Sequence, residues 1–153
     1  MDNSYVAKVF VAATVNVLST MAGFTPAVGR PFVKKDMAAC GDVTAIVGVV
    51  GDKRGSIAVT FTKSSAIAVA RAMLGDDIQD VLQDIKDTVG EVTNMISGQA
   101  RAMLAEQGLS MQGSTPILIM GDNHTVSHMT NAPVMALPFS SSMGAFTVEF
   151  CLE

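Results

Sequence analysis

The side chains with the clearest chemical potential are two carboxylates and one carboxamide in the middle of the chain, Asp87, Glu91 and Asn94. With about 100° of rotation per residue in an α-helix, they fall on one stripe and recur in successive turns. A carboxylate can pair with a cation, and an amide can both donate and accept a hydrogen bond. Because the opposite side of this segment is apolar, the stripe is predicted to point outward and to be offered to a partner.

The helix that must hold these side chains is predicted from its apolar stripe. The members of that stripe are Ile78, Val81, Leu82, Ile85, Val89, Val92, Ile96 and Met103. They lie within about 60° of the helix side centred on Ile85, so this side is expected to face the core. Asp76 or Asp77 can cap the helix, and Gly108 is expected to end it after about Gln107.

Two glycines and a proline accompany the polar stripe. Gly90 and Gly98 lie about 40° to either side of Asn94 on the helix, where each costs about 1 kcal/mol relative to alanine. Their missing side chains would let another backbone approach the amide closely, although a helix held by packing can also tolerate glycine. Pro116 opens a predicted strand, and strand punctuation is its simpler interpretation.

Length and composition predict one compact domain. The chain has 153 residues, of which 49% are hydrophobic, and its mean hydropathy is +0.40. A chain of this size can bury a core without metal or disulfide support. No long apolar run is present and the first residues are polar rather than basic, so we expect a cytoplasmic protein that does not insert into membranes. Cys40 and Cys151 are expected to stay reduced and buried.

The charge distribution argues against a nucleic-acid surface and favours a cationic partner. The net charge is −4, and the basic residues are scattered along the chain. Six of the fourteen acidic residues lie between Asp76 and Glu91, where their negative field would attract a positive group. A solvated helix face is the simpler interpretation of the acids from Asp76 to Asp84, which suit a helix N-terminus.

The order of predicted elements repeats, which indicates an internal duplication. In the first half, a helix over 5–21 precedes strands at 32–38, 43–50 and 56–62. A short helix over 64–75 follows. In the second half, a long helix from about 76 precedes strands at 116–120, 134–139 and 145–152. The last strands of the two halves, Gly55–Phe61 and Gly144–Phe150, share glycine, an apolar residue, valine and phenylalanine at an offset of 89.

The predicted fold is therefore α+β, a mostly antiparallel six-stranded sheet made by two pseudo-symmetric halves, with two long helices packed on it. One domain is expected over residues 1–153, with halves at about 1–62 and 76–153 joined by the short helix. In the helices, Asn16 matches Asn94 at an offset of 78, and Ala13 stands where Glu91 does. We expect this first copy of the polar site to be closed over by packing.

The spacing Asp87-x3-Glu91-x2-Asn94, followed by Pro116 at the start of a strand, resembles the signature of the CheC, CheX and FliY phosphatases of bacterial chemotaxis. The resemblance covers the whole chain, because the duplicated helix-plus-three-strands order also matches. CheC-like members carry two Glu/Asn helices, whereas CheX-like members carry one. With Ala13 in place of the first glutamate, the chain resembles the CheX-like members.

The resemblance implies a phosphatase that acts on the aspartyl phosphate of a CheY-like response regulator. The phosphorylated regulator would supply the phosphoaspartate, a divalent metal such as Mg2+ and a lysine, so no cofactor is expected in this chain. Asn94 would position the attacking water, and Glu91 would pair with the regulator's lysine. Asp87 would have a supporting role. The resemblance also implies a homodimer, which exposed strand edges would suit.

The polar stripe also allows a function without catalysis, in which a binding adaptor holds a response regulator or a flagellar-switch component and hydrolyses nothing. His124-x3-His128 has the spacing of two metal ligands on a helix, but Gly121 and Asp122 predict a loop there and no third ligand is evident, so no metal site is expected. The eleven methionines are more often core filler than the lining of a sensor's pocket.

Overall fold

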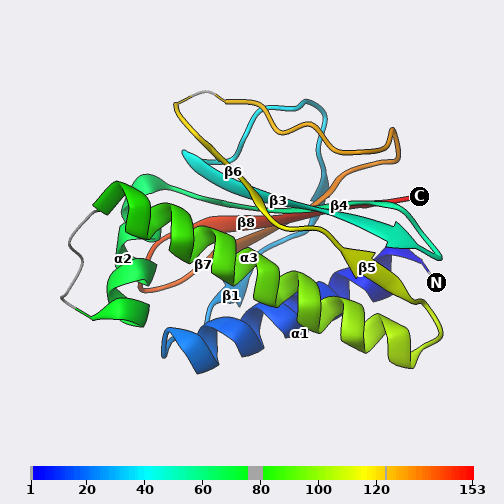
Figure 1. Ribbon diagram of the computed structural model, residues 1–153, viewed down its shortest axis with the longest axis horizontal. Coiled ribbons are helices and arrows are strands. Elements are labelled where there is room, and N and C mark those ends of the chain that lie inside the picture. Colours follow the sequence, from blue (N-terminus) through cyan, green and yellow to red (C-terminus); the bar gives the residue numbers. More distant parts are fainter. Residues whose placement is uncertain (1, 76–80, 123) are drawn as a thin grey trace.

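Helices cover one face of a single sheet in the computed structural model, which describes residues 2–75, 81–122 and 124–153 (Figure 1). The helices are α1 (Asn3–Met21), α2 (Lys63–Leu74) and α3 (Val81–Glu106). The strands are β1 (Ala27–Val28), β2 (Phe32–Val33), β3 (Val43–Gly51), β4 (Gly55–Phe61), β5 (Met111–Gly113), β6 (Ile117–Met120), β7 (Met135–Ser140) and β8 (Phe146–Leu152). Loop segments within 34–42, 121–122 and 124–134 lie over the other face of the sheet.

Among the described residues, all strand pairs are antiparallel. The eight strands occupy six positions across the sheet, because β1 and β2 share the position beside β7, and β5 and β6 share the position beside β3. The order is β1-β7-β8-β4-β3-β5, with β2 also paired to β7 and β6 also paired to β3. The predicted α+β class, its antiparallel sheet and the packing of both long helices on it are confirmed. The strand expected at 32–38 is shorter, because only Phe32–Val33 pairs with β7. The two short strands β1 and β5 were not expected from the sequence.

The two strands that carry the repeated sequence pattern pair with each other at the centre of the sheet. Val59 of β4 pairs with Val148 of β8, and these two valines are equivalent at the offset of 89 seen in the sequence. Beside them, the rings of Phe61 and Phe146 stack with centroids 5.0 Å apart. The short strands of each half then pair with the inner strand of the other half, β1 and β2 with β7, and β5 and β6 with β3. The two halves therefore build one sheet together.

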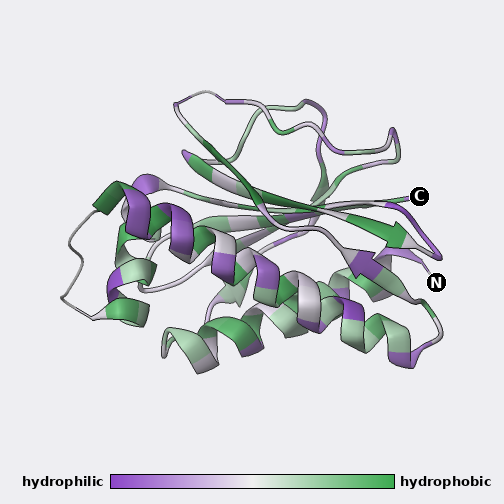
Figure 2. Cartoon of the chain, in the orientation of Figure 1, coloured by the Kyte–Doolittle hydropathy of each residue, from purple (hydrophilic) through white to green (hydrophobic). Residues whose placement is uncertain are grey.

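Both long helices pack against the sheet and against each other. Phe10 of α1 stacks on Phe150 of β8 with ring centroids 5.0 Å apart. On α3, the buried apolar residues are Ile85, Val89, Val92, Ile96, Ala100 and Leu104. The side of α3 that faces the viewer in Figure 2 is largely hydrophilic, so the helix is amphipathic in the sense that its sequence predicts.

The ends of the helices differ in part from expectation. Val81 and Leu82 were expected in the core, but they are 45% and 55% exposed, because they line an open hollow at the start of α3. Ile78 and the proposed caps at 76 and 77 lie outside the described residues. Helix α2 is capped by Thr62, whose hydroxyl accepts a hydrogen bond from the Ser65 amide at 3.1 Å, and not by a serine. Gly108, at φ 88°, follows the end of α3 as predicted.

Helix α1 is long and apolar enough, by length and composition alone, to cross a membrane. In this fold it packs against α3 and β7. Its buried residues are Val6, Ala7, Val9, Phe10, Ala13, Thr14, Val17 and Leu18. Helix α1 therefore packs one side on the core, and 39% of its most apolar 18-residue window is buried.

Candidate functional site

Helix α3 holds the three polar side chains of the predicted stripe on its outer side. Asp87, Glu91 and Asn94 are exposed, while Val92 and Ile96 on the opposite side are fully buried. Because the buried side is packed on the sheet, the helix cannot rotate to hide the stripe. The predicted outward orientation of these side chains is confirmed, and their chemical roles stay predictions.

Glu91 and Asn94 are the residues of the stripe with the most specific predicted roles. Among the residues that the structure describes, no hydrogen bond or ion pair involves the side chain of Glu91 or Asn94. Asp87 differs, because its Oδ1 accepts a hydrogen bond from Gln83 Nε2 at 2.9 Å. The free carboxylate and the free amide are thus available to a binding partner without the loss of an internal contact.

The two glycines that flank Asn94 have different surroundings. Gly90 is buried, and a Cβ at this position would lie 3.3 Å from Leu118 Cδ2 of β6. The expectation that Gly90 leaves room for a partner's backbone was therefore wrong, because Leu118 of the same chain fills that side. Gly98 is half-buried, and the nearest atom to a Cβ there, Arg101 Nη2, is 4.0 Å away. Pro116 is half-buried, and it directly precedes β6, a position that suits strand punctuation.

The matching region of the first half is closed by packing, as the sequence predicts. Ala13 and Val9 of α1 are 1% and 4% exposed. Asn16, which corresponds to Asn94, is exposed, but its Nδ2 donates a hydrogen bond to Gln99 Oε1 of α3 at 2.7 Å. This half has no carboxylate beside its amide, and the amide is already paired. Of the two copies, as far as the structure describes them, the one on α3 is the one that presents a free amide.

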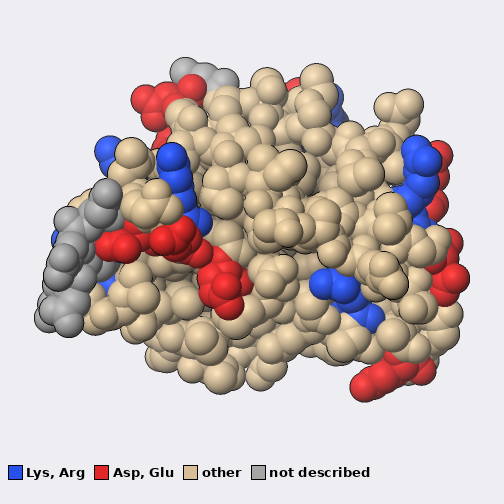
Figure 3. All heavy atoms as spheres, in the orientation of Figure 1, with Lys and Arg blue, Asp and Glu red and all other residues tan. Residues whose placement is uncertain are grey.

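The polar stripe continues to Arg101, a residue that the sequence analysis missed. Its Nε donates a hydrogen bond to the buried Ser97 Oγ at 3.1 Å. Its guanidinium lies against Gly113 of β5, where a Cβ would be 2.9 Å from Arg101 Cζ. In Figure 3, acidic side chains gather over the first half of α3 and a separate basic group lies over its second half. The seven-residue spacing from Asn94 to Arg101, about two helical turns, was the available signal.

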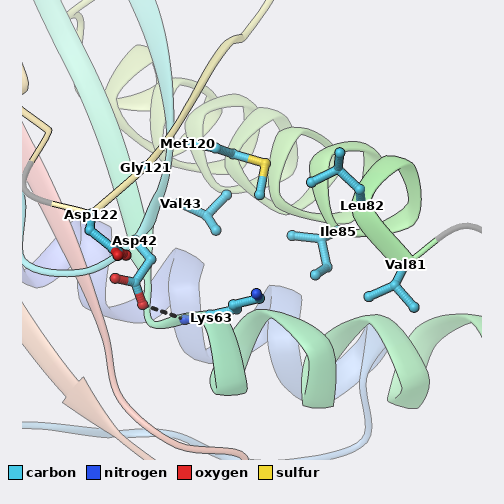
Figure 4. A pocket seen from close by; sticks show the side chains of 9 residues that line it. All are labelled: Asp42, Val43, Lys63, Val81, Leu82, Ile85, Met120, Gly121 and Asp122. Carbon is cyan, nitrogen blue, oxygen red and sulfur yellow. Dashed lines mark hydrogen bonds between the residues drawn. The ribbon is translucent and has the colours of Figure 1, made fainter.

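A hollow of about 460 Å³ lies at the start of α3, between α3, α2 and the ends of β3 and β6 (Figure 4). Its apolar lining is Val43, Val81, Leu82, Ile85 and Met120, and its polar lining is Asp42, Lys63 and Asp122. The Asp42 carboxylate accepts a hydrogen bond from the backbone amide of Lys63 at 2.8 Å. This contact joins the start of β3 to the start of α2, so that Asp42 has a structural role.

A buried polar cluster on the other face of the sheet was also missed. Glu149 of β8 is fully buried, and its carboxylate lies 3.3 Å from Lys34 Nζ and 3.1 Å from His128 Nε2. His128 Nδ1 lies 2.6 Å from Ser56 Oγ, whereas His124 contacts Thr44 Oγ1 at 2.6 Å. The two histidines thus belong to separate hydrogen-bond groups that hold the loops on the sheet. Among the described residues, no three potential ligands gather into a metal site.

The two cysteines are not paired with each other. Cys151 is buried as expected, but Cys40 is exposed, because it lies in the loop that covers the sheet and not in the core. Burial of part of its thiol raises the pKa of Cys40; the Lys34 ammonium opposes this shift, and the Glu149 carboxylate adds to it. This shift favours the neutral thiol over the thiolate.

The chain is similar to known proteins in sequence and in fold. Residues 43–140 match the family model described as "Chemotaxis phosphatase CheX". The chain is 20% identical over 136 residues to the CheY-P phosphatase CheX of Thermotoga maritima, which covers 88% of this chain and 86% of that protein.

Two solved structures have the same fold over nearly the whole chain. The chemotaxis protein CheX from Desulfovibrio desulfuricans is 66% identical, with a TM-score of 0.92 and coverage of 97% of this chain and 99% of the other. The CheX chain of the CheX-CheY-BeF3-Mg2+ complex from Borrelia burgdorferi is 25% identical, with a TM-score of 0.81 and coverage of 96% and 97%.

Proposed function

Because the chain belongs to the chemotaxis phosphatase CheX family, we propose that it hydrolyses the aspartyl phosphate of a CheY-like response regulator. The observation that carries this proposal is the exposure of Glu91 and Asn94 on one packed helix, with both side chains free of contacts to other described residues. The relatives named as a CheY-P phosphatase and as part of a CheX-CheY complex support the choice of partner. The protein is then a protein aspartyl-phosphate phosphatase, and we propose that it acts in the cytoplasm.

In the proposed reaction, α3 docks at the phosphorylation site of the regulator, and Asn94 orients a water molecule in line with the acyl phosphate. The water oxygen forms a bond to phosphorus while the bond between phosphorus and the aspartyl oxygen breaks. The products are inorganic phosphate, which takes up the proton of the water, and a free aspartate carboxylate. Because a carboxylate is a good leaving group, orientation of the water can supply the acceleration without a strong base.

The remaining residues of the stripe would hold the complex in register. Glu91, one turn from Asn94, would accept a charge-assisted hydrogen bond from a lysine of the regulator. Asp87 would add to the negative field that attracts this lysine. Gly98 leaves open space beside the stripe for the regulator's backbone. No cofactor is proposed in this chain, and a divalent cation such as Mg2+ would be held by the regulator.

The test is the rate at which a purified phosphorylated regulator loses its phosphate. We expect the wild-type protein to accelerate this loss and Asn94→Ala to reduce the acceleration by about 100-fold or more, since orientation of the water would be lost. Glu91→Ala should raise KM as well. Asn16→Ala is the matched control, because it removes the corresponding amide of the first half and should leave turnover intact.

Two results would contradict the proposal. If the wild-type protein binds the regulator but leaves the rate of phosphate loss unchanged, the protein is a binding adaptor. If Asn94→Ala keeps the full acceleration, Asn94 does not position the water. Because Asn94 is exposed, its substitution should change the free energy of unfolding by less than about 0.5 kcal/mol, which thermal unfolding can check.

A further inference from the structure

We propose that Arg101 determines the direction in which a response regulator docks along α3, by pairing with a carboxylate on the regulator's surface. The inference rests on the proposed function, because it assumes that the stripe around Asn94 is the docking surface. It adds a second, oppositely charged contact to that surface. Arg101 would be a specificity residue and not a catalytic one, since it lies away from the reacting atoms.

The position of Arg101 on α3 fits this role. It follows Asn94 by seven residues, which corresponds to about 10 Å along the helix axis and an angular offset of about 20°. A regulator that covers Asn94 therefore also covers Arg101. The residue is half-buried and so remains accessible to a partner.

The guanidinium of Arg101 is held in place before any partner arrives. Ser97 Oγ, itself buried, accepts its Nε–H at 3.1 Å. Gly113 provides the surface on which it lies, because a Cβ at this position would be 2.9 Å from Cζ and from Nη2. An arginine fixed in this way loses less conformational entropy when it binds a carboxylate.

Arg101 forms no ion pair in the part of the chain that the structure describes. The ion pairs present there are those of Glu149 with Lys34 and His128. The first half of α3 carries Asp84, Asp87 and Glu91, with Lys86 among them. The stripe is thus acidic at one end and basic at the other. A regulator docked in the reverse direction would face like charges at both ends, which disfavours that orientation.

The experiment measures binding of a BeF3−-activated regulator and dephosphorylation of the phosphorylated one. Arg101→Gln should raise Kd and KM by about tenfold, the effect of one hydrogen bond to a charged group, and should leave kcat unchanged. The loss should shrink as ionic strength rises, because salt screens an accessible ion pair. Gly113→Ala should also raise KM, because it displaces the guanidinium without changing the charge.

Arg71→Gln is the matched control, since it removes the same charge from the exposed surface of α2. Arg101→Gln values of Kd and KM equal to those of Arg71→Gln would overturn the inference while the proposed function stands. An effect of Arg101→Gln on kcat alone would also overturn it. A wild-type protein that neither binds nor dephosphorylates the regulator would overturn both proposals.

Discussion

At the scale of single residues, a group of buried ionisable side chains lies on the face of the sheet away from α3. Glu149 is fully buried between the Lys34 ammonium and the His128 ring. Lys34 also donates to the Ala38 carbonyl oxygen at 2.6 Å, so this pair ties the loop after β2 to the sheet. A buried charge that loses its partner is costly, even where the pair itself contributes little net stability.

We therefore expect Glu149→Gln to lower the free energy of unfolding by about 3 kcal/mol, because it leaves the buried Lys34 ammonium without a counter-charge. Urea denaturation measures this change. Lys34→Met is the companion variant, and the double variant should lose less than the sum of the two single losses. Additive losses would show that Lys34 and Glu149 do not stabilise each other.

At the scale of elements, the interior glycines of α3 have separate roles. Gly90 faces Leu118 of β6, so its small size serves internal packing. Among the described residues, the nearest side-chain atom to a Cβ added at Gly98 is Arg101 Nη2 at 4.0 Å, so packing within the chain does not require a glycine there. A glycine that weakens a helix without an internal reason is a candidate for a partner's approach.

Gly98→Ala should raise the free energy of unfolding by about 0.5–1 kcal/mol, because alanine is the better helix former and the space is open. The same change should raise KM for the phosphorylated regulator, since the methyl group enters the docking surface. Ala102→Gly, on the exposed side of the same helix, is the control and should lower stability by a similar amount. A more stable protein with unchanged KM would show that the regulator does not approach Gly98.

At the scale of the whole molecule, the sheet has two open edges that could pair with another strand. One edge, formed by β5 and β6, lies beside α3 and would be close to a docked regulator. The other edge, formed by β1 and β2, carries the exposed apolar residues Val28, Phe32 and Val33. We propose that the protein is a homodimer and that this second edge forms the contact, because it leaves α3 accessible in both copies.

Val33→Lys should convert the dimer to a monomer in sedimentation velocity experiments, because it places a charge on an edge that would be buried between two copies. Val33 is 51% exposed, so the monomer itself should remain folded. Ile117→Lys, on β6 at the other edge and 64% exposed, is the control and should remain dimeric. A monomeric wild-type protein, or a dimer that only Ile117→Lys disrupts, would contradict this assignment.

The features that could be predicted from the amino-acid sequence are local or periodic. The apolar period of α3 and the alternation in the inner strands predict which side of each element is buried, because burial follows from spacing within one element. The outward stripe of Asp87, Glu91 and Asn94 and the closure of the first half around Ala13 were predictable on this basis. The shared pattern at an offset of 89 indicated a duplication, but it did not indicate that the two repeated strands pair with each other, as Val59 and Val148 do.

The features that emerged with the folded chain depend on contacts between distant segments. Leu118 fills the space beside Gly90, Gly113 supports Arg101, and Lys34 neutralises Glu149 from 115 residues away. The exchange of short strands between the halves also escaped prediction, because strands of two to four residues carry too little pattern to indicate which strand they pair with. Spacing along the chain specifies which face of an element is buried, but it does not specify which other segment covers that face.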